Sequence, residues 1–129
     1  RFYGVTIDNY EICDYIKDIK QYYDELDAFL FPSMFEGYGQ VAAEAMARGV
    51  PVIAKRYPAI CEATCNHANY VEIEDYQDIE VWNKGLHDIK DNYDYWLKQT
   101  EQGAKLLKER QDQEILDLKL FLEQFVLED

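Results

Sequence analysis

Hydrophobic residues follow two patterns along the chain, and their alternation predicts a layered α/β fold. Short, continuously apolar runs occupy residues 28–31 and 50–54, as expected for parallel strands buried on both faces. Between them, residues 40–48 are rich in alanine and predict a helix, and Gly49 stands where a left-handed C-terminal cap is expected. Two strands joined through one helix pair in parallel, with a right-handed crossover. The centre of the chain is therefore predicted to be a strand–loop–helix–strand unit.

Weaker patterns predict the remaining elements. Residues 2–7 and 70–73 are expected to be strands because of their β-branched and aromatic residues. Helical periodicity predicts helices over residues 11–26, 59–64, 79–92, 93–109 and 112–127. The last of these carries a stripe of apolar residues that we expect to pack on this domain or on a partner domain rather than on a membrane: Ile115, Leu118, Leu122 and Phe125.

These elements predict an α/β fold, a Rossmann-like parallel sheet flanked by helices with a helical C-terminal tail. We expect a single domain over residues 1–129, with the α/β core in residues 1–74 and closing helices in residues 75–129. Three or four strands are few for a complete doubly wound sheet, and the chain begins without Met on a predicted strand. We therefore expect the chain to be part of a longer protein, with a truncated domain.

Charge excludes several classes of partner. The 129 residues include 13 basic and 26 acidic side chains, a formal net charge of −13. Such a chain lacks the broad positive surface that nucleic-acid binding requires, and it cannot act as a polybasic membrane anchor. Any phosphate must therefore be held locally, for example by backbone amides.

Cysteine and histidine do not predict a metal site. The number of cysteines is odd (Cys13, Cys61 and Cys65), which argues against a disulfide framework and favours a reducing, cytoplasmic setting. Only Cys61, Cys65 and His67 cluster in the sequence, whereas structural zinc takes four ligands. We expect His67 and His87 to be surface residues, and Lys55 and Arg56 to lie on the surface after their strand.

The loop before the alanine-rich helix has the features of a phosphate site. Gly37 and Gly39 allow the backbone to turn sharply and to approach a ligand closely. The amides near Gly39, Gln40 and Val41 precede the first internal hydrogen bonds of the helix and lie at the positive end of its dipole. This loop follows a parallel strand, at the edge of the sheet where open α/β folds bind ligands.

Two carboxylates extend this interpretation. Glu44 lies one turn after Gln40 on the same helix face, and Glu36 precedes Gly37 in the loop. Ionised carboxylates only accept hydrogen bonds, so they suit hydroxyl groups rather than phosphate. A ligand with a diphosphate between two sets of hydroxyls, such as a UDP-sugar or GDP-sugar, has the matching pattern.

An ordered set of motifs resembles retaining glycosyltransferases of the GT-B fold, particularly family 4. Glu36 and Glu44 reproduce the Glu-x7-Glu motif of that family. The surrounding segments match in order: Tyr23-x-x-x-Asp27, Phe31-Pro32-Ser33, Glu36-Gly37-Tyr38-Gly39, Glu44-Ala-Met-Ala, Gly49-Val-Pro-Val-Ile-Ala54, and Glu62, which Cys61 precedes in place of a proline. After Glu62, residues 65–69 replace the usual Asp-Gly or Asn-Gly turn. About residues 1–73 track the family.

The resemblance implies roles for the matching residues. Glu36 would contact the donor sugar and Glu44 would contact the ribose hydroxyls. The resemblance implies that both are catalytic residues. The backbone amides of Gly37, Tyr38, Gly39, Gln40 and Val41 would hold the sugar and diphosphate, with Tyr38 as a wall of the site. The enzyme would need no metal or cofactor, and it would transfer the sugar with retained anomeric configuration.

The same resemblance implies that other parts of the enzyme lie outside this chain. The Lys/Arg pair that grips the diphosphate would come from upstream in this domain, and the acceptor site would come from an N-terminal domain. The isolated chain is therefore expected to be catalytically inactive. The full enzyme is expected in the cytoplasm, where peripheral association with the inner membrane face would suit a lipid acceptor.

Two other functions remain open from the sequence. Gly37-x-Gly39-x-x-Ala42 fits a dinucleotide-binding fingerprint, and Arg56 could accept an NADP 2′-phosphate. However, residues 32–36 separate the strand from the first glycine, and no acidic residue ends the next strand. The second alternative is a degenerate donor domain that has been kept for protein interactions.

Overall fold

The computed structural model describes residues 11–32 and 39–127, which form a parallel sheet between layers of helices. The sheet contains β1 (Phe29–Phe31), β2 (Val52–Lys55) and β3 (Asn69–Val71), in the order β1-β2-β3. Both strand pairs are parallel, with Phe31 opposite Ala54 and Ala54 opposite Tyr70. All three strands therefore end at the same edge, as predicted for a Rossmann-like domain.

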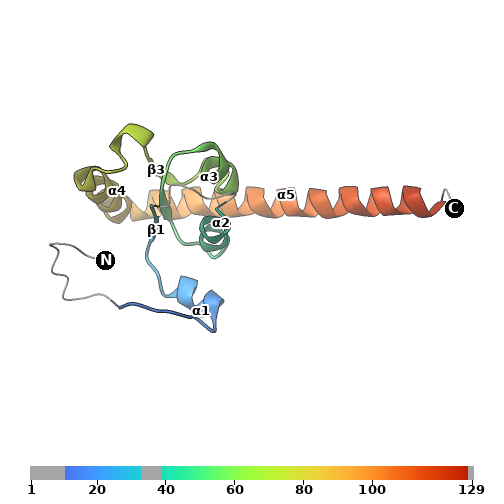
Figure 1. Cartoon of the computed structure of the whole chain (residues 1–129), viewed down its shortest axis with the longest axis horizontal. Coiled ribbons are helices and arrows are strands. Elements are labelled where there is room, and N and C mark those ends of the chain that lie inside the picture. The colour runs from blue at the N-terminus through green and yellow to red at the C-terminus, as the bar shows by residue number, and fades with distance from the viewer. Residues whose placement is uncertain (1–10, 33–38, 128–129) are drawn as a thin grey trace.

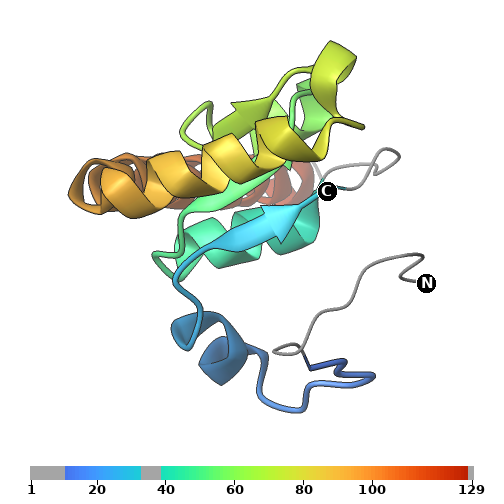
Figure 2. The ribbon, with the colours of Figure 1, turned by 90° about the vertical axis from the view of Figure 1, so that its left-hand side faces the viewer.

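Helices cover both faces of this sheet. They are α1 (Ile19–Asp24), α2 (Gln40–Ala47), α3 (Pro58–Ala63), α4 (Ile79–Asp91) and α5 (Tyr93–Leu127), with a 3₁₀ turn, η1, at Ile73–Asp75. Figure 2 shows α2 and α4 on opposite sides of the strands. Alternate residues of β2 divide between the two cores: Val52 and Ala54 pack with Met46 of α2, whereas Ile53 packs with Trp82 of α4. This alternation is why the strand is apolar at successive positions.

The central unit agrees closely with its prediction. The alanine-rich segment is a helix, and Gly49 after it has a φ of 82°, the left-handed conformation expected of a C-terminal cap. The strands predicted at residues 28–31, 50–54 and 70–73 are present, and none of their ends differs by more than two residues. The strand predicted at residues 2–7 lies outside the described residues.

The prediction of a long helix over residues 11–26 is wrong. Only α1 forms, and Asp18 caps it by accepting a hydrogen bond from the amide of Gln21 at 3.1 Å. Ile12 and Tyr15 are exposed, so the apolar side of the predicted helix has no surface to pack on among the described residues. A helix without tertiary packing does not persist at this length.

The prediction that the first strand is buried on both faces is also wrong. Leu30 is 44% exposed, whereas Phe31 is buried. The cause is topological, because β1 lies at the edge of the described sheet and has one neighbour, β2. The sequence pattern reports the apolar character of a strand but not whether a second strand flanks it.

The two helices predicted at residues 93–109 and 112–127 are one helix, α5, which has no break at Arg110–Gln111. Both residues have good helix propensity, so nothing local ends the helix between them. In Figure 1 the second half of α5 extends well beyond the rest of the molecule. Its apolar stripe is exposed there, so it does not pack on the described part of this domain, and packing on a partner domain stays a prediction. None of the described helices is long and apolar enough to cross a membrane.

Candidate functional site

The start of α2 is held at the edge of the sheet by a residue whose backbone conformation favours glycine. Gly39 has a φ of 81°, in the left-handed region that side chains disfavour. A Cβ atom on Gly39 would also lie 2.6 Å from Ile60 Cδ1 of α3. The amides of Ala42 and Ala43 donate to Gly39 O at 3.0 and 3.2 Å, so internal hydrogen bonding of the helix begins there. The two amides before them, of Gln40 and Val41, are those that a helix cannot satisfy internally.

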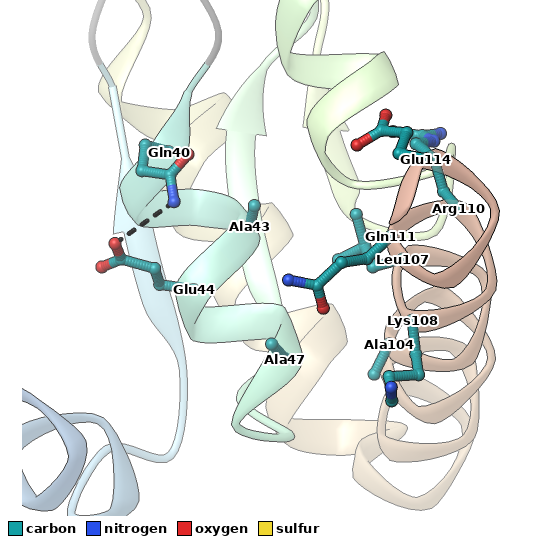
Figure 3. A pocket seen from close by; sticks show the side chains of 10 residues that line it. All are labelled: Gln40, Ala43, Glu44, Ala47, Ala104, Leu107, Lys108, Arg110, Gln111 and Glu114. Atoms are coloured by element: carbon teal, nitrogen blue, oxygen red, sulfur yellow. Dashed lines mark hydrogen bonds between the residues drawn. The ribbon is translucent and has the colours of Figure 1, made fainter. Parts of the chain in front are cut away.

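One turn further, the Glu44 carboxylate is half-buried and held in place. Tyr23 Oη donates to Glu44 Oε2 at 3.0 Å, and Gln40 Nε2 donates to Oε1 at 3.5 Å. Figure 3 shows the Gln40 and Glu44 side chains on the same side of α2, as the one-turn spacing predicts. Tyr23 Oη also lies 3.4 Å from Val41 O, which ties α1 to the first turn of α2.

Burial of the Tyr23 hydroxyl, together with its hydrogen bond to Glu44, raises the pKa of Tyr23 to about 12. The phenol is therefore protonated at neutral pH and donates its proton to the carboxylate. The sequence placed Tyr23 in a motif without assigning it a role. Its spacing from Glu44 along the chain gives no local signal, because the contact joins two different helices.

A groove of about 430 Å³ lies on the other side of α2, against α5. In Figure 3, Ala43 and Ala47 face Ala104, Leu107 and Gln111 across this groove. The small alanine side chains leave space between the two helices. Glu44 and Gln40 also line it, so the groove begins beside the candidate site.

The expectation that Lys55 lies on the surface is wrong. It is the last residue of β2, is only 5% exposed, and has its Nζ atom 4.7 Å from the centre of the Tyr76 ring. A second tyrosine ring, of Tyr57, lies 5.9 Å away. Cation–π contacts of this kind offset part of the cost of burying an ammonium group.

Arg56, in contrast, is exposed as expected and is already engaged. Its Nε atom lies 2.8 Å from Glu72 Oε1, and its guanidinium carbon lies 4.6 Å from the centre of the Tyr70 ring. These contacts raise the pKa of Arg56, chiefly through the hydrogen bond to Glu72. A guanidinium held in this way is less suited to an NADP 2′-phosphate than the sequence alternative assumed.

No group of three or more potential metal ligands comes together within residues 11–32 and 39–127. Cys65 is buried, which raises the pKa of its thiol, and the Arg110 Nη2 atom lies 3.4 Å from its sulfur. Cys65 and Asn66 adopt φ values of 51° and 59°, so two ordinary residues make the left-handed turn for which an Asp-Gly or Asn-Gly pair is usual. His67 is half-buried with Nδ1 against Cys65 O, whereas His87 is exposed as expected.

The structure places four of the predicted site residues together on the first turns of α2. Gly39, Gln40, Val41 and Glu44 form its start and the turn behind it. Glu36, Gly37 and Tyr38 lie outside the described residues. The roles assigned to all seven remain predictions.

Comparison with known proteins supplies the family. The sequence profile described as "Glycosyl transferases group 1" matches residues 6–106. A sucrose synthase of Melioribacter roseus is 31% identical over 85 residues, which cover 64% of this chain and 11% of that protein. The O-antigen chain mannosyltransferase RfbU of Salmonella typhimurium is 32% identical over 74 residues, covering 57% of this chain and 21% of that protein.

A third relative, an uncharacterised 41.2 kDa protein of the cps region in Klebsiella pneumoniae, is 37% identical over 79 residues. That match covers 53% of this chain and 22% of the relative. The matched segments thus span about a tenth to a fifth of these relatives. No solved structure matches the chain significantly. The profile covers well over half of the 129 residues, and its central part contains the Gly39–Glu44 segment, so the chain belongs to the glycosyl transferases group 1 family.

Proposed function

We propose that this chain supplies the donor site of a retaining glycosyltransferase that uses a nucleotide sugar. One observation carries the proposal: a half-buried carboxylate, Glu44, is held by Tyr23 and Gln40 one turn behind the start of α2. Its remaining acceptor capacity suits the paired hydroxyls of a ribose. The amides at the start of α2 suit the diphosphate that follows the ribose in a nucleotide sugar.

The same arrangement supports transfer without a metal ion. The start of α2 carries a partial positive charge that stabilises negative charge on the leaving diphosphate. We assign Glu36 to the donor sugar and the amides from Gly37 to Val41 to the sugar and diphosphate. The bond from the anomeric carbon to the phosphate oxygen breaks, the acceptor oxygen bonds to the same face, and the acceptor proton passes to the leaving diphosphate.

The acceptor side of the reaction belongs to other parts of the enzyme in this proposal. The curated relatives are several times longer than the segments that match this chain. An N-terminal domain would bring the acceptor, and upstream residues of the donor domain would add cationic contacts to the diphosphate. The 129-residue chain would then bind the donor weakly and transfer nothing. We place the full enzyme in the cytoplasm, with association at the inner membrane face if its acceptor is a lipid.

An amide NMR titration of this chain with UDP-glucose, GDP-mannose and NADP tests the proposal. We expect a nucleotide sugar to shift the amides of Gly39, Gln40 and Val41. Glu44→Gln should weaken that binding about tenfold, because an amide replaces the carboxylate that receives the ribose hydroxyls. Glu101→Gln, at an exposed position of α5, is the matched control and should leave the affinity unchanged.

Two results would contradict the proposal. If NADP alone shifted these amides, the site would be a dinucleotide site. If no nucleotide sugar shifted them at about 10 mM, a concentration at which ligands with millimolar dissociation constants are bound, this chain would not hold a donor. The base of the better ligand, uracil or guanine, would begin to define the donor.

A further inference from the structure

The Glu44 carboxylate has a fixed partner on another helix. A glutamate side chain on a helix surface can adopt several rotamers, and fixing one of them costs conformational entropy. Tyr23 Oη, from α1, donates to Glu44 Oε2 on α2 at 3.0 Å. In Figure 3 the carboxylate points away from α5, whereas Ala43 and Ala47 face that helix. The contact with Tyr23 therefore fixes the carboxylate on the α1 side of α2.

Packing fixes the Tyr23 hydroxyl in turn. The side chain is only 3% exposed, and its ring meets the ring of Phe29 on β1 edge to face, with centroids 5.8 Å apart. The ring of Tyr22 lies 5.5 Å away, and Tyr23 Oη lies 3.4 Å from Val41 O in the first turn of α2. The sheet and two helices thus set the position of this hydrogen-bond donor.

The two oxygens of the Glu44 carboxylate have different surroundings. Oε2 accepts the buried Tyr23 hydroxyl, whereas the donor to Oε1 among the described residues is the exposed Gln40 side chain at 3.5 Å. That distance is long for an N–H···O hydrogen bond. A ligand hydroxyl can therefore replace the Gln40 amide more easily than it can replace the Tyr23 hydroxyl, and Oε1 is the oxygen open to a ligand.

This difference bears on which ligands the proposed donor site accepts. A carboxylate accepts hydrogen bonds and cannot donate them, so Oε1 favours ligands that bring hydroxyl groups. We propose that Tyr23 is a positioning residue that makes the donor site selective for the ribose hydroxyls, by holding Glu44 with Oε1 towards them. The inference rests on the proposed function. A contact that is already in place binds more tightly and discriminates more strongly than one that must first be ordered.

A second contact joins the same two helices and provides a control. Arg48 donates to Asp24 through Nε at 3.0 Å and through Nη2 at 2.5 Å. Asp24 follows Tyr23 in α1, and both members of the ion pair are partly exposed. Asp24→Asn loosens α1 on α2 without removing a group that contacts Glu44. It therefore separates a purely structural role of Tyr23 from a positioning role.

An amide NMR titration of the 129-residue chain tests the inference with UDP, GDP and the 2′,3′-dideoxy analogue of each. The shifts of Gly39, Gln40 and Val41 give the dissociation constants. We expect wild type to bind the better diphosphate about tenfold more tightly than its dideoxy analogue. Tyr23→Phe keeps the buried ring and should weaken binding of the ribose form about fivefold. The affinity for the dideoxy form should change by less than about twofold, because that form has no hydroxyl for Glu44.

Two further variants locate the effect. Asp24→Asn should keep the selectivity of wild type, about tenfold for the ribose form. In a Glu44→Gln background, Tyr23→Phe should not weaken binding of the ribose form any further, because the carboxylate that it positions is gone. The ¹H–¹⁵N spectrum of each variant verifies that the fold is kept.

Three results would overturn the inference and leave the donor site standing. Tyr23→Phe could keep the full preference for ribose, which would mean that the hydroxyl does not set it. Asp24→Asn could lose as much selectivity as Tyr23→Phe, which would assign the effect to the docking of α1. Tyr23→Phe could weaken binding equally with and without the Glu44 carboxylate. A wild-type chain that bound both forms equally, or neither, would instead remove the assignment of Glu44 to ribose and the inference with it.

Discussion

At the scale of single residues, Gly39 joins the candidate site to the core. Its left-handed φ and the short approach to Ile60 are separate constraints, and Gly49 has the first without the second. We expect Gly39→Ala to lower the free energy of unfolding by about 2–4 kcal/mol, from backbone strain and overpacking together. Gly49→Ala should cost about 1–2 kcal/mol from strain alone. Urea unfolding followed by circular dichroism measures both losses.

A second-site change separates the two contributions at Gly39. Ile60→Val removes the Cδ1 atom that the new methyl group would meet, at a cost of about 1 kcal/mol in wild type. In the Gly39→Ala background the same change should cost less or restore stability. Strictly additive losses would show that the contact with Ile60 contributes nothing.

Tyr23 gives the free energy of unfolding a pH dependence at alkaline pH. Its pKa is about 12 in the folded protein and about 10 when unfolded, so the folded state holds this proton more tightly. The stabilisation from this group is complete below pH 10 and is lost as the pH rises towards 12. Tyr23→Phe should lower the free energy of unfolding at pH 8 by about 1–2 kcal/mol. At pH 11 the difference in unfolding free energy between this variant and wild type should be smaller.

Urea unfolding at pH 8 and pH 11 measures this difference, with Tyr95→Phe at an exposed position of α5 as the control for loss of a hydroxyl. A deficit that stayed constant between the two pH values would show that the pKa of Tyr23 is the same in the folded and unfolded states.

At the scale of elements, α5 combines two segments with different roles. Its first half packs on α2, and Arg110 donates to Glu62 O at 3.0 Å, whereas residues 115–125 are exposed. A chain ending at Glu114 should lose less than about 1 kcal/mol of unfolding free energy, because exposed helical residues add little without packing. Its helical circular dichroism should fall by about the share of the removed turns.

Arg110→Ala provides the contrast within the same helix. It removes a charge-assisted hydrogen bond to the last turn of α3 and should cost about 1–2 kcal/mol. Thermal unfolding ranks the two changes. A larger loss from the truncation than from Arg110→Ala would mean that the exposed half of α5 supports the body.

The same elements show which parts of the fold the sequence could predict. The unit from β1 to β2 was predictable because alanine content, Gly49 and two apolar runs each specify local structure. The extent of α1 was not predictable. The helix begins after Asp18, where Tyr23 packs on the core, and the apolar residues before Asp18 are exposed in the described structure. The two helices predicted in place of α5 are joined because Arg110 and Gln111 favour helix, so nothing local ends the helix between them.

At the scale of the whole molecule, the candidate site was predictable only where it is local. Gly39, Gln40 and Glu44 follow from spacing along one helix. The Tyr23 contact to Glu44 and the burial of Lys55 depend on how separate elements meet, and neither has a periodic signal. The exposure of Leu30 likewise depends on β1 lying at the edge of the described sheet, which is a property of the sheet rather than of the segment.

The net charge of the chain predicts how salt changes its stability. Self-repulsion among acidic residues destabilises the compact state, and salt screens it. Screening also weakens the exposed ion pairs, which are Arg48–Asp24, Arg56–Glu72 and Lys108–Asp112 among the described residues. Exposed pairs contribute at most about 1 kcal/mol each. With 26 acidic and 13 basic residues, at least half of the carboxylates have no cation available, so repulsion should dominate.

We therefore expect the free energy of unfolding to rise as NaCl increases from about 0.01 M to about 0.15 M, where the screening length falls from about 30 Å to about 8 Å. Urea unfolding at each concentration measures the slope, because urea adds no charge. Replacing Asp117 and Glu123 with glutamine should flatten the slope, since it removes two carboxylates that form no ion pair among the described residues. KCl is the control for ion-specific effects and should act like NaCl. A fall in stability with salt would show that the ion pairs, rather than the excess acidic charge, govern the electrostatics of this domain.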